Sequence, residues 1–193
     1  MKVKFLKSAP SIKDATQPNF TEVALLGRSN VGKSSFLNAF TNQKIAKTSG
    51  TPGKTRLINF FEVEDETKRY ILVDLPGFGY AKVSKSMQKE WGKNLDEFLK
   101  KRFNIKLFIH LRDARHPNME IDENVDNYLH SFLKKDQQIL TVFTKIDKLK
   151  QSEIAKLKKD YPNSLFVSNV KRRGISEIKR KINEILWGEY ENN

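Results

Sequence analysis

The fold of this chain is decided by one stretch of sequence, Gly27-Arg28-Ser29-Asn30-Val31-Gly32-Lys33-Ser34. It matches G-x-x-x-x-G-K-[ST], the phosphate-binding P-loop. An apolar run at residues 22–26 precedes it and has the length of a buried strand. After it, Phe36, Leu37 and Phe40 recur at helical spacing. The motif therefore stands between a strand and a helix, a context that argues against a chance match in a Gly/Ser loop.

The chemistry of this stretch suits a nucleotide. Its glycines let the backbone curl so that successive N–H groups point inward, and the start of the following helix adds unpaired N–H groups. Lys33 supplies a positive charge to the β- and γ-phosphates, and the Ser34 hydroxyl is a ligand for Mg²⁺. We expect phosphate contacts along the whole stretch, from Gly27, Arg28, Ser29, Asn30, Val31, Gly32, Lys33 and Ser34.

The composition is that of a globular chain with a polar surface. The 193 residues suit one domain, with 38% hydrophobic and 31% charged residues. Because cysteine is absent, disulfides and thiolate metal sites are excluded. No apolar run approaches the roughly 20 residues of a membrane span, and charges interrupt the first seven residues, unlike a signal peptide. We expect a cytoplasmic protein without a membrane partner.

The formal net charge of +13 indicates a polyanionic partner, with nucleic acid ahead of a membrane. The alternative is a lysine-rich solvated surface, since charge alone indicates a partner only weakly. Both interpretations stay open at this point. The basic residues gather in a few groups that we expect to flank the nucleotide site: Lys100, Lys101, Arg102, Arg112, Arg115, Lys156, Lys158, Lys159, Lys171, Arg172, Arg173, Lys179, Arg180 and Lys181.

The hydrophobic pattern alternates between strands and helices. Strands are expected at residues 22–26, 57–63, 70–74, 105–111, 139–143 and 165–167, and helices at 36–41, 87–99, 121–133, 152–159 and 175–186. A polar turn at 64–67 joins two of the strands into an antiparallel hairpin, and the later alternation implies right-handed crossovers. The prediction is an α/β fold in one domain over 1–193: a mostly parallel six-stranded sheet with one antiparallel strand and helices on both faces. Residues 1–20 form an N-terminal extension with a possible edge strand at 3–6, and residues 188–193 a frayed tail.

A second loop with nucleotide chemistry is Asp74-Leu75-Pro76-Gly77, directly after a predicted strand. The carboxylate of Asp74 can hold Mg²⁺ through water, and the Gly77 N–H can meet the γ-phosphate and so sense its presence. Thr55 lies in a Gly-rich loop before the hairpin, where its hydroxyl completes the Mg²⁺ shell. Thr51 is its rival for that role, and Thr55 is preferred because it lies next to the strand. Lys33, Thr55 and Gly77 are the predicted catalytic residues.

Two further loops are suited to read a purine base. In Thr144-Lys145-Ile146-Asp147, the Asp147 carboxylate can accept two hydrogen bonds from guanine, whereas adenine would leave it unpaired. The Lys145 stem can lie along the base plane. In Val167-Ser168-Asn169, a backbone N–H can meet guanine O6. All four loops follow predicted strands, and the carboxyl edge is where open α/β sheets bind ligands.

The remaining aromatic and imidazole side chains are given no chemistry. His110 lies within a predicted strand and is expected to be buried or half-buried, and His116 and His130 to be on the surface. None of the three has the spacing of zinc ligands. Trp91 and the pair Phe60-Phe61 are expected in the core rather than as stacking platforms for bases.

The stretches 27–34, 51–61, 74–80 and 144–147 together resemble the bacterial EngB (YihA/YsxC) GTPases, of the TrmE-Era-EngA-EngB-Septin-like class. The resemblance covers nearly the whole chain, and D-L-P-G-F-G-Y at 74–80 is specific. It implies a Ras-like fold and slow GTP hydrolysis coupled to assembly of the large ribosomal subunit, with a role in normal cell division and septation. It further implies a monomer that contacts rRNA and ribosomal proteins. By match to the family's pattern, Mg²⁺ falls to Ser34 and Thr55. GTP contacts fall to Gly27 through Ser34, Gly53, Lys54, Thr55, Arg56, Leu57, Asp74, Leu75, Pro76, Gly77, Thr144, Lys145, Ile146, Asp147, Val167, Ser168 and Asn169.

The chain departs from the broader GTPase pattern in three places. Phe78 follows Gly77 where Ras-type enzymes carry a water-positioning Gln, so the source of catalysis is open. Thr144 replaces an Asn that braces the base pocket, and Asn169 stands where small residues are common. Asn30 resembles the asparagine that ligates K⁺ in potassium-activated GTPases, the alternative being an asparagine that only stabilises the loop.

Two other classes of function compete with this interpretation. One is a P-loop ATPase or nucleotide kinase, against which stand Asp147 and the lack of an evident lid domain in 193 residues. The other is a basic RNA-binding protein with a vestigial nucleotide site, against which stand the intact Lys33, Ser34 and Asp74.

Overall fold

The computed structural model describes residues 1–17, 19–46, 57–65, 68–78 and 85–188. The strands are β1 (Lys2–Ala9), β2 (Glu22–Gly27), β3 (Ile58–Asp65), β4 (Lys68–Asp74), β5 (Ile105–Asp113), β6 (Gln138–Thr144) and β7 (Leu165–Phe166). The α-helices are α1 (Lys33–Thr41), α2 (Lys85–Lys101), α3 (Glu120–His130), α4 (Gln151–Asp160) and α5 (Ile175–Trp187), and short 3-10 helices lie at Ile12–Asp14 and Ile146–Lys148. Every strand and helix predicted from the sequence pattern is present.

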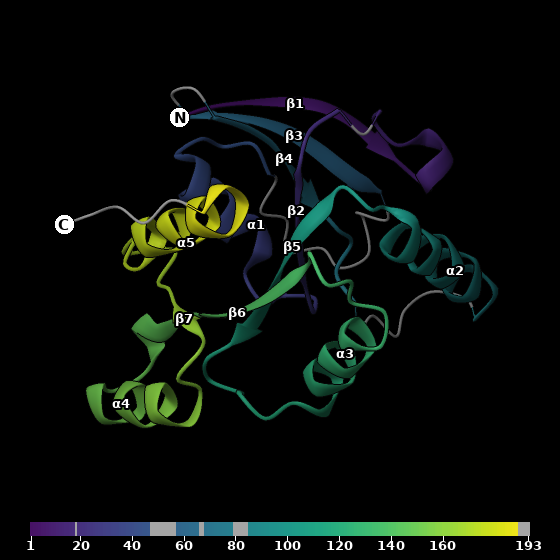
Figure 1. Ribbon diagram of the computed structural model, residues 1–193. Helices are drawn as coiled ribbons and strands as arrows, with labels where there is room; N and C mark the ends of the chain where they lie inside the picture. Colours follow the sequence, from purple (N-terminus) through teal and green to yellow (C-terminus); the bar gives the residue numbers. More distant parts are fainter. Residues whose placement is uncertain (18, 47–56, 66–67, 79–84, 189–193) are drawn as a thin grey trace.

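All strands join one sheet in the order β1-β3-β4-β2-β5-β6-β7 (Figure 1). Strand β3 runs antiparallel to both of its neighbours, β1 and β4, while β4, β2, β5, β6 and β7 pair in parallel. The predicted α/β fold with one antiparallel strand is therefore confirmed. Because the parallel strands all point the same way, the loops after β2, β4, β6 and β7 meet at one edge of the sheet.

The predicted number of six strands is wrong, because the N-terminal segment supplies a seventh. Strand β1 pairs with β3 along its whole length, from Lys2 opposite Glu64 to Ala9 opposite Ile58. Its lysines point to solvent, and Phe5 packs edge-on against Phe61 with the ring centroids 5.6 Å apart. The alternating lysines hide this strand in the sequence, where only residues 3–6 read as a possible edge strand.

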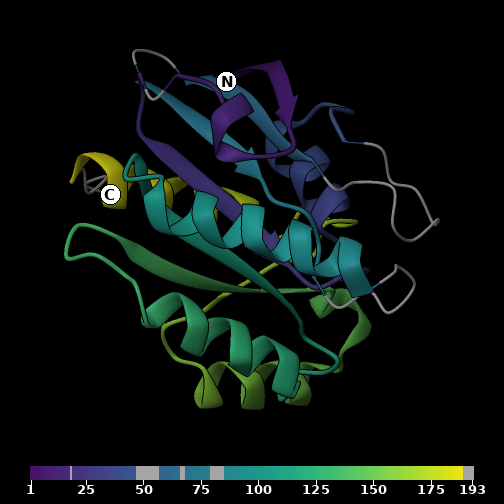
Figure 2. The ribbon, with the colours of Figure 1, turned by 90° about the vertical axis from the view of Figure 1, so that its right-hand side faces the viewer.

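Helices cover both faces of the sheet, α1 and α5 on one face and α2 and α3 on the other (Figures 1 and 2). Central strand β2 is buried throughout and faces both layers. Val23 and Leu25 pack in the core under α1 and α5, whereas Ala24 and Leu26 pack in the core under α2 and α3. A strand buried on both faces is continuously apolar rather than alternating, which is the pattern of residues 23–26.

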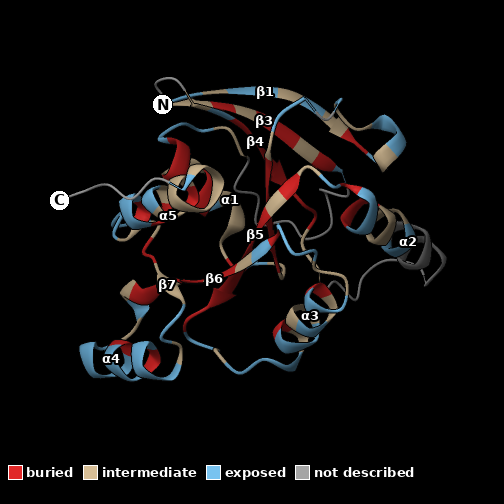
Figure 3. Cartoon of the chain, in the orientation of Figure 1, coloured by how far each residue is buried: buried red, intermediate tan, exposed pale blue. Residues whose placement is uncertain are grey.

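Burial follows these layers, with the strands buried and the outer helix faces exposed (Figure 3). Phe60 and Phe61 are both in the core, on opposite faces, as predicted. His110 is fully buried, and His116 and His130 are exposed, also as predicted. The side chain of Trp91 lies outside the described part of the chain.

Helix α3 ends earlier than the predicted 121–133. It stops at His130, where the Ser131 hydroxyl donates to the Tyr128 carbonyl at 2.6 Å and the chain turns. Phe132 and Leu133 still pack against the α2–α3 core from the turn, which is why they fitted the helical pattern. Their periodicity reflects the shared core rather than continued helix.

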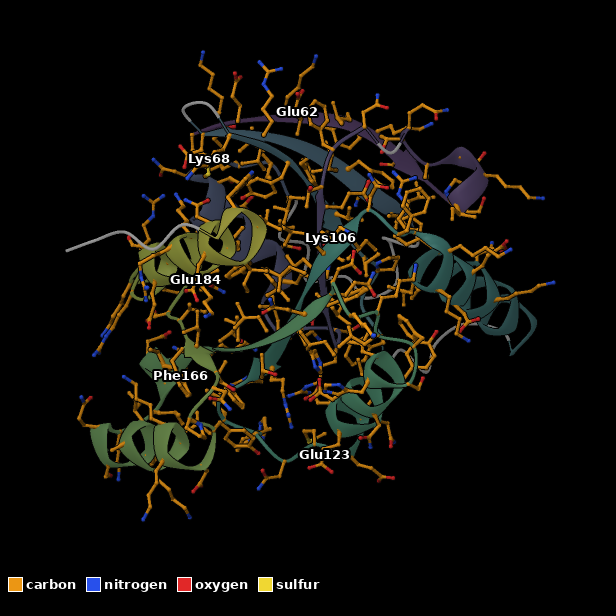
Figure 4. All side chains as sticks on the ribbon, in the orientation of Figure 1. Glu62, Lys68, Lys106, Glu123, Phe166 and Glu184 are labelled. Atoms are coloured by element: carbon orange, nitrogen blue, oxygen red, sulfur yellow. The ribbon has the colours of Figure 1, made fainter. Side chains whose placement is uncertain are left out.

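Helix α4 closes the β7 edge of the sheet over a small aromatic cluster. Phe166, which Figure 4 labels on β7, stacks on Phe143 with centroids 5.6 Å apart and planes 11° apart. The guanidinium of Arg112 lies 5.6 Å from the ring centroids of both Phe143 and Tyr161. No helix in the described ranges is long and apolar enough to cross a membrane.

Two arginines predicted to lie on the basic surface are buried instead. Arg102 is 6% exposed and pairs with Glu22 at 2.7 Å, and Arg112 is 4% exposed and pairs with Asp126 at 3.2 Å. A buried guanidinium needs a carboxylate partner to offset its desolvation, and both arginines have one. They belong to the core, so that prediction is wrong for these two residues.

Candidate nucleotide site

The P-loop connects β2 to α1 through a tightly constrained backbone. Gly32 has φ +99° and Asn30 has φ +64°, in the left-handed region that favours glycine and asparagine. A Cβ on Gly27 would lie 2.9 Å from Val31 Cγ1 and 3.0 Å from the Leu111 carbonyl oxygen. Glycine is therefore required where the strand packs closely on its neighbour, and the loop begins at that point.

The loop after β4 is fastened to the P-loop by backbone hydrogen bonds. The Ser29 N–H donates to the Phe78 carbonyl at 2.9 Å, and the Phe78 N–H donates to the Gly27 carbonyl at 3.3 Å. A Cβ on Gly77 would lie 3.2 Å from Ser29 Oγ. The predicted γ-phosphate sensor is thus held directly against the phosphate-binding loop, with Leu75 and Pro76 buried behind it.

Lys33 and Asp74 meet at the centre of the site. Lys33, the first residue of α1, donates from Nζ to Asp74 Oδ1, and the Asp74 side chain is 7% exposed. The other oxygen, Oδ2, accepts from Asn59 Nδ2 at 3.3 Å. The structure therefore brings together the two side chains that the sequence assigns to phosphate and to Mg²⁺.

The donor set fits a magnesium ion. Ser34 follows Lys33 in the first turn of α1, and Lys33 pairs with the Asp74 carboxylate, so the site offers a hydroxyl and a carboxylate as oxygen ligands. Within the described residues, no group of three or more His, Cys, Asp or Glu side chains is placed to hold a metal. Mg²⁺ prefers one or two protein oxygens together with phosphate oxygens and water, so it suits this arrangement.

Thr144 braces the P-loop from the end of β6. Its hydroxyl lies 2.6 Å from the Val31 carbonyl and 3.2 Å from the Arg112 carbonyl, and the side chain is fully buried. The threonine that replaces the usual asparagine thus still ties the base-side loop to the phosphate loop, by a shorter side chain.

Two more side chains reach the P-loop from the base side. Lys145, at φ +62°, donates to the Asn30 carbonyl at 2.6 Å and to Asp113 Oδ2 at 2.9 Å. Asn169 donates from Nδ2 to the Gly32 carbonyl at 3.2 Å. Its Oδ1 is buried and has no partner in the described part of the chain. Such an orphaned acceptor beside the P-loop is suited to a donor on a ligand.

Asp147 is held by the loop after β7. Ser168 donates from Oγ to Asp147 Oδ1 at 2.7 Å, and the same hydroxyl accepts from the Lys171 N–H at 3.1 Å. The N–H groups of Val167 and Ser168 are already paired, with the Phe143 and Arg173 carbonyls. Of the three residues predicted to meet guanine O6, Asn169 is the one whose backbone N–H has no hydrogen-bond partner within the described part of the chain.

The chain is similar to known GTP-binding proteins. A family described as 50S ribosome-binding GTPase matches residues 22–145. A probable GTP-binding protein EngB from Aliarcobacter butzleri (strain RM4018) is 54% identical over 193 residues, covering 96% of both chains. The protein of the same description from Campylobacter lari is 58% identical over 187 residues, covering 94% of both chains.

The chain belongs to the EngB family of GTPases. It is therefore a GTP-binding protein that hydrolyses GTP. This sets aside both the ATPase or nucleotide kinase interpretation and the interpretation as an RNA-binding protein with a vestigial site.

Solved structures share the fold. A crystal structure of a probable GTP-binding protein engB aligns with a TM-score of 0.67 at 23% identity, covering 88% of this chain and 100% of that chain. The G domain of the T. maritima FeoB iron transporter aligns with a TM-score of 0.61 at 28% identity, covering 86% and 98%.

Part of the predicted EngB site lies outside the described residues: Thr51, Gly53, Lys54, Thr55 and Arg56. The second magnesium ligand and the choice between Thr51 and Thr55 are therefore not tested. Leu57 is described and is 40% exposed just before β3.

Sequence reasoning missed a carboxylate that joins the two halves of the EngB site. Asp113, at the end of β5, accepts from Arg115 Nη2 at 2.7 Å and from Lys145 Nζ at 2.9 Å. Burial works to raise the pKa of Asp113, but the Arg115 and Lys145 hydrogen bonds outweigh it and hold the pKa well below its usual range. Arg28 Nη2 of the P-loop lies 3.9 Å from the same carboxylate.

Below Asp113 lies a buried charge network that the sequence also did not reveal. His110 Nδ1 lies 2.6 Å from Asp126 Oδ1, and its Nε2 lies 3.5 Å from Asp122 Oδ1. Asp122 Oδ2 lies 3.6 Å from Arg28 Nε, and the Phe78 ring lies 5.8 Å from the imidazole. The network thus connects the P-loop and the Gly77 loop to α3. The signal was the pair of carboxylates at i and i+4 on one helix face, opposite a histidine in an apolar strand.

Proposed function

We propose that this EngB-family GTPase is a switch in assembly of the large ribosomal subunit, acting in the cytoplasm and needed for normal cell division and septation. The observation that carries the proposal is the match to a family described as 50S ribosome-binding GTPase over residues 22–145. A binding surface on the ribosome must carry positive charge, and the chain has a net charge of +13.

The phosphate side of the proposed switch uses Lys33, Ser34, Asp74 and Gly77. Mg²⁺, when bound, supplies positive charge at the β- and γ-phosphates, with Ser34 and Thr55 as its proposed ligands and Asp74 holding it through water. Lys33 turns from Asp74 toward the phosphates. The Gly77 N–H meets the γ-phosphate, and the loop is held in reach by its hydrogen bonds to Gly27 and Ser29.

The base side confers the preference for guanine. Asp147 accepts from guanine N1–H and N2–H₂, while Ser168 keeps the carboxylate oriented from the opposite side. The Asn169 N–H faces guanine O6. Adenine offers no such pair of donors and would leave a desolvated carboxylate unsatisfied.

A potassium ion at Asn30 is part of the same proposal. Phe78 cannot orient water, and the P-loop arginine, Arg28, is engaged by Asp113 and Asp122. A monovalent cation between the α- and γ-phosphates would supply the positive charge that an arginine finger supplies elsewhere.

The proposed partner surface continues from the base side. Lys171, Arg172 and Arg173 are exposed just beyond Asn169, after Val170. Lys156, Lys158 and Lys159 are exposed on neighbouring α4. These side chains suit an RNA phosphate backbone, which positive charge recognises through shape rather than sequence.

The direct test is sedimentation of the purified protein with large ribosomal subunits. We expect more protein in the subunit fraction with a non-hydrolysable GTP analogue than with GDP, because the γ-phosphate orders the loops that border the surface. Equal binding in the two nucleotide states would contradict the proposed switch, and no binding in either would contradict the partner.

A further inference from the structure

Three polar side chains face one another across neighbouring strands and end at the site. Ser8 of β1 lies opposite Asn59 of β3, and Asn59 lies opposite Asp74 of β4. Residues directly opposite in a sheet project from the same face. The Ser8 hydroxyl donates to Asn59 Oδ1 at 2.6 Å, and Asn59 Nδ2 donates to Asp74 Oδ2 at 3.3 Å. A row of hydrogen bonds therefore runs from the outermost strand to the carboxylate.

The chemistry of the row fixes the orientation of its middle member. The ionised Asp74 carboxylate only accepts hydrogen bonds, so the Asn59 amide must turn its NH₂ toward it. That leaves the Asn59 carbonyl facing Ser8, whose hydroxyl rotates to donate. Without Ser8, the carbonyl end of the amide would have one partner fewer and the NH₂ would be less firmly directed.

The row of hydrogen bonds matters because the Lys33 ammonium group cannot pair fully with Asp74 and with the phosphates at the same time. Lys33 holds Asp74 Oδ1, but in the proposed function its charge goes to the phosphates. Asn59 then remains as the side chain holding the other oxygen. Being neutral, its amide orients the carboxylate without cancelling the negative charge that a magnesium-bound water requires.

We propose that Asn59 is a positioning residue for the Asp74 carboxylate, and that Ser8 on the N-terminal strand keeps Asn59 in its donating orientation. The inference rests on the proposed magnesium role of Asp74. It assigns β1, the outer strand, a part in the nucleotide site. Along the sequence, Asn59 stands between Thr55 and Asp74, two residues of the proposed magnesium site.

The test separates magnesium-dependent from magnesium-independent nucleotide binding. The affinity for a fluorescent GDP is measured in excess Mg²⁺ and in excess EDTA. The magnesium ratio, which is the Kd in EDTA divided by the Kd in Mg²⁺, is then compared among variants. Asn59→Leu, which keeps the size but removes both hydrogen bonds, should reduce the ratio about tenfold, with little change in EDTA. Ser8→Ala should reduce it about threefold, because the Asn59 donor is kept but no longer directed.

Gln137→Met provides a matched control. Gln137 is a buried amide that, like Asn59, accepts one hydrogen bond and donates one. It accepts from the Lys134 N–H at 3.1 Å and donates to the Ile105 carbonyl at 2.8 Å. It lies where β5 begins, at the opposite end of the strands from the site. The Gln137→Met substitution should lower the melting temperature as Asn59→Leu does, but it should leave the magnesium ratio unchanged.

The outcomes are distinct. If the wild-type affinity does not depend on Mg²⁺, the proposed magnesium role itself is wrong. If the wild type depends on Mg²⁺ and Asn59→Leu depends on it equally, the positioning role is overturned. Should Asn59→Leu fail to fold, Ser8→Ala decides, since an unchanged ratio in that variant overturns the proposal.

Discussion

At the scale of single residues, Asp147 is the proposed reader of the base. Asp147→Asn should abolish the preference for guanine, because an amide cannot accept from both guanine donors, whereas it pairs with the carbonyl edge of xanthine. Ser168 donates to Oδ1 and can equally donate to the amide oxygen, so the fold should be retained. Competition between GTP and xanthosine triphosphate for binding measures this change in nucleotide preference. A variant that still prefers GTP would show that Asp147 does not read the base.

The proposed potassium site can be tested at Asn30. We expect faster GTP hydrolysis in KCl than in NaCl, and Asn30→Ala should remove the difference, because the amide oxygen is the proposed ligand. The Asn30 backbone carbonyl, which accepts from Lys145 at 2.6 Å, is kept in this variant, although alanine is less suited to φ +64°. Asn30→Gly, which favours that φ, is the control for the backbone. Equal rates in both salts, with Asn30→Ala harmless, would assign the side chain to loop stability alone.

His110 makes stability depend on pH. Burial lowers the pKa of His110, but the Asp122 and Asp126 carboxylates outweigh it and the net pKa is raised. Its stabilising contribution is therefore complete below the unfolded pKa of about 6.5 and is lost as pH rises through the higher folded pKa. The free energy of unfolding, measured by urea denaturation as pH rises from below the unfolded pKa to above the folded pKa of His110, should fall. The fall should be smaller in Asp126→Asn. Exposed His130→Gln should behave as wild type, and a fall of the same size in Asp126→Asn would contradict the assignment.

The residues of the nucleotide site show how much can be predicted from the sequence at the scale of single residues. The sequence predicts roles for Lys33, Asp74 and Asp147 because each proposed role needs one residue type at a fixed place in a short motif. Asn59 was not assignable, since its partners Ser8 and Asp74 lie 51 and 15 positions away. Their contact depends on the register of three strands, which no local pattern contains.

At the scale of elements, a buried ion pair fixes the end of α2 to the start of β2. Arg102, just after α2, pairs with Glu22 at 2.7 Å and also donates to the Thr16 carbonyl at 2.7 Å. Burial raises the pKa of Glu22, and Arg102 opposes that effect. The pair joins the end of α2 to residues 16–22, which lie 80 or more positions earlier in the sequence.

Removing one partner should cost far more than removing both. Arg102→Met should lower the free energy of unfolding by about 3–5 kcal/mol, because it leaves Glu22 buried and unpaired. Adding Glu22→Gln should recover part of that loss, and the coupling is measured by urea denaturation of both single variants and the double variant. Additive losses would indicate that Arg102 acts through Thr16 and its packing rather than through Glu22.

Strands and helices were predictable from the sequence where a single hydrophobic pattern, either a continuous apolar run or a helical repeat, dominated a segment. Strand β2 and helix α1 were assigned because an apolar run and a helical stripe flank the P-loop without ambiguity. Strand β1 was only partly predicted, because lysines alternate through it and its stability comes from pairing with β3. The end of α3 was misplaced because Phe132 and Leu133 share the core that the helix faces.

At the scale of the whole molecule, the sheet joins a phosphate half and a base half along one edge. Thr144, Lys145 and Asn169 each bond to a P-loop carbonyl, so the loops after β6 and β7 are fixed to the loop after β2. The Gly77 loop is fixed to the same loop from the other side. A change at the γ-phosphate can therefore reach the surface beyond Asn169 through a few direct contacts.

That surface is where the net charge should act. Lys171, Arg172 and Arg173 are exposed on the turn that leads into α5, and Gly174, at φ +82°, closes the turn. Reversing all three side chains to Glu should weaken binding to large ribosomal subunits at least tenfold and reduce its steep dependence on salt, because fewer phosphates are neutralised. GDP affinity should hardly change, since Lys171 touches Ser168 only through its backbone N–H. Each replacement keeps a Cβ, so the left-handed backbone of Arg172, φ +52°, is not strained further.

The control reverses equal charge at the opposite edge of the sheet. Lys2, Lys4 and Lys7 are exposed on β1, as far from β7 as the strand order allows. Their reversal to Glu gives the same change in net charge. Co-sedimentation across a KCl series should then separate the two variants, with the β1 variant close to wild type. Equal losses in both would mean that only total charge matters. If binding depends on neither the salt concentration nor the bound nucleotide, the proposal is wrong, and the net charge of +13 belongs to a solvated surface without a role in binding.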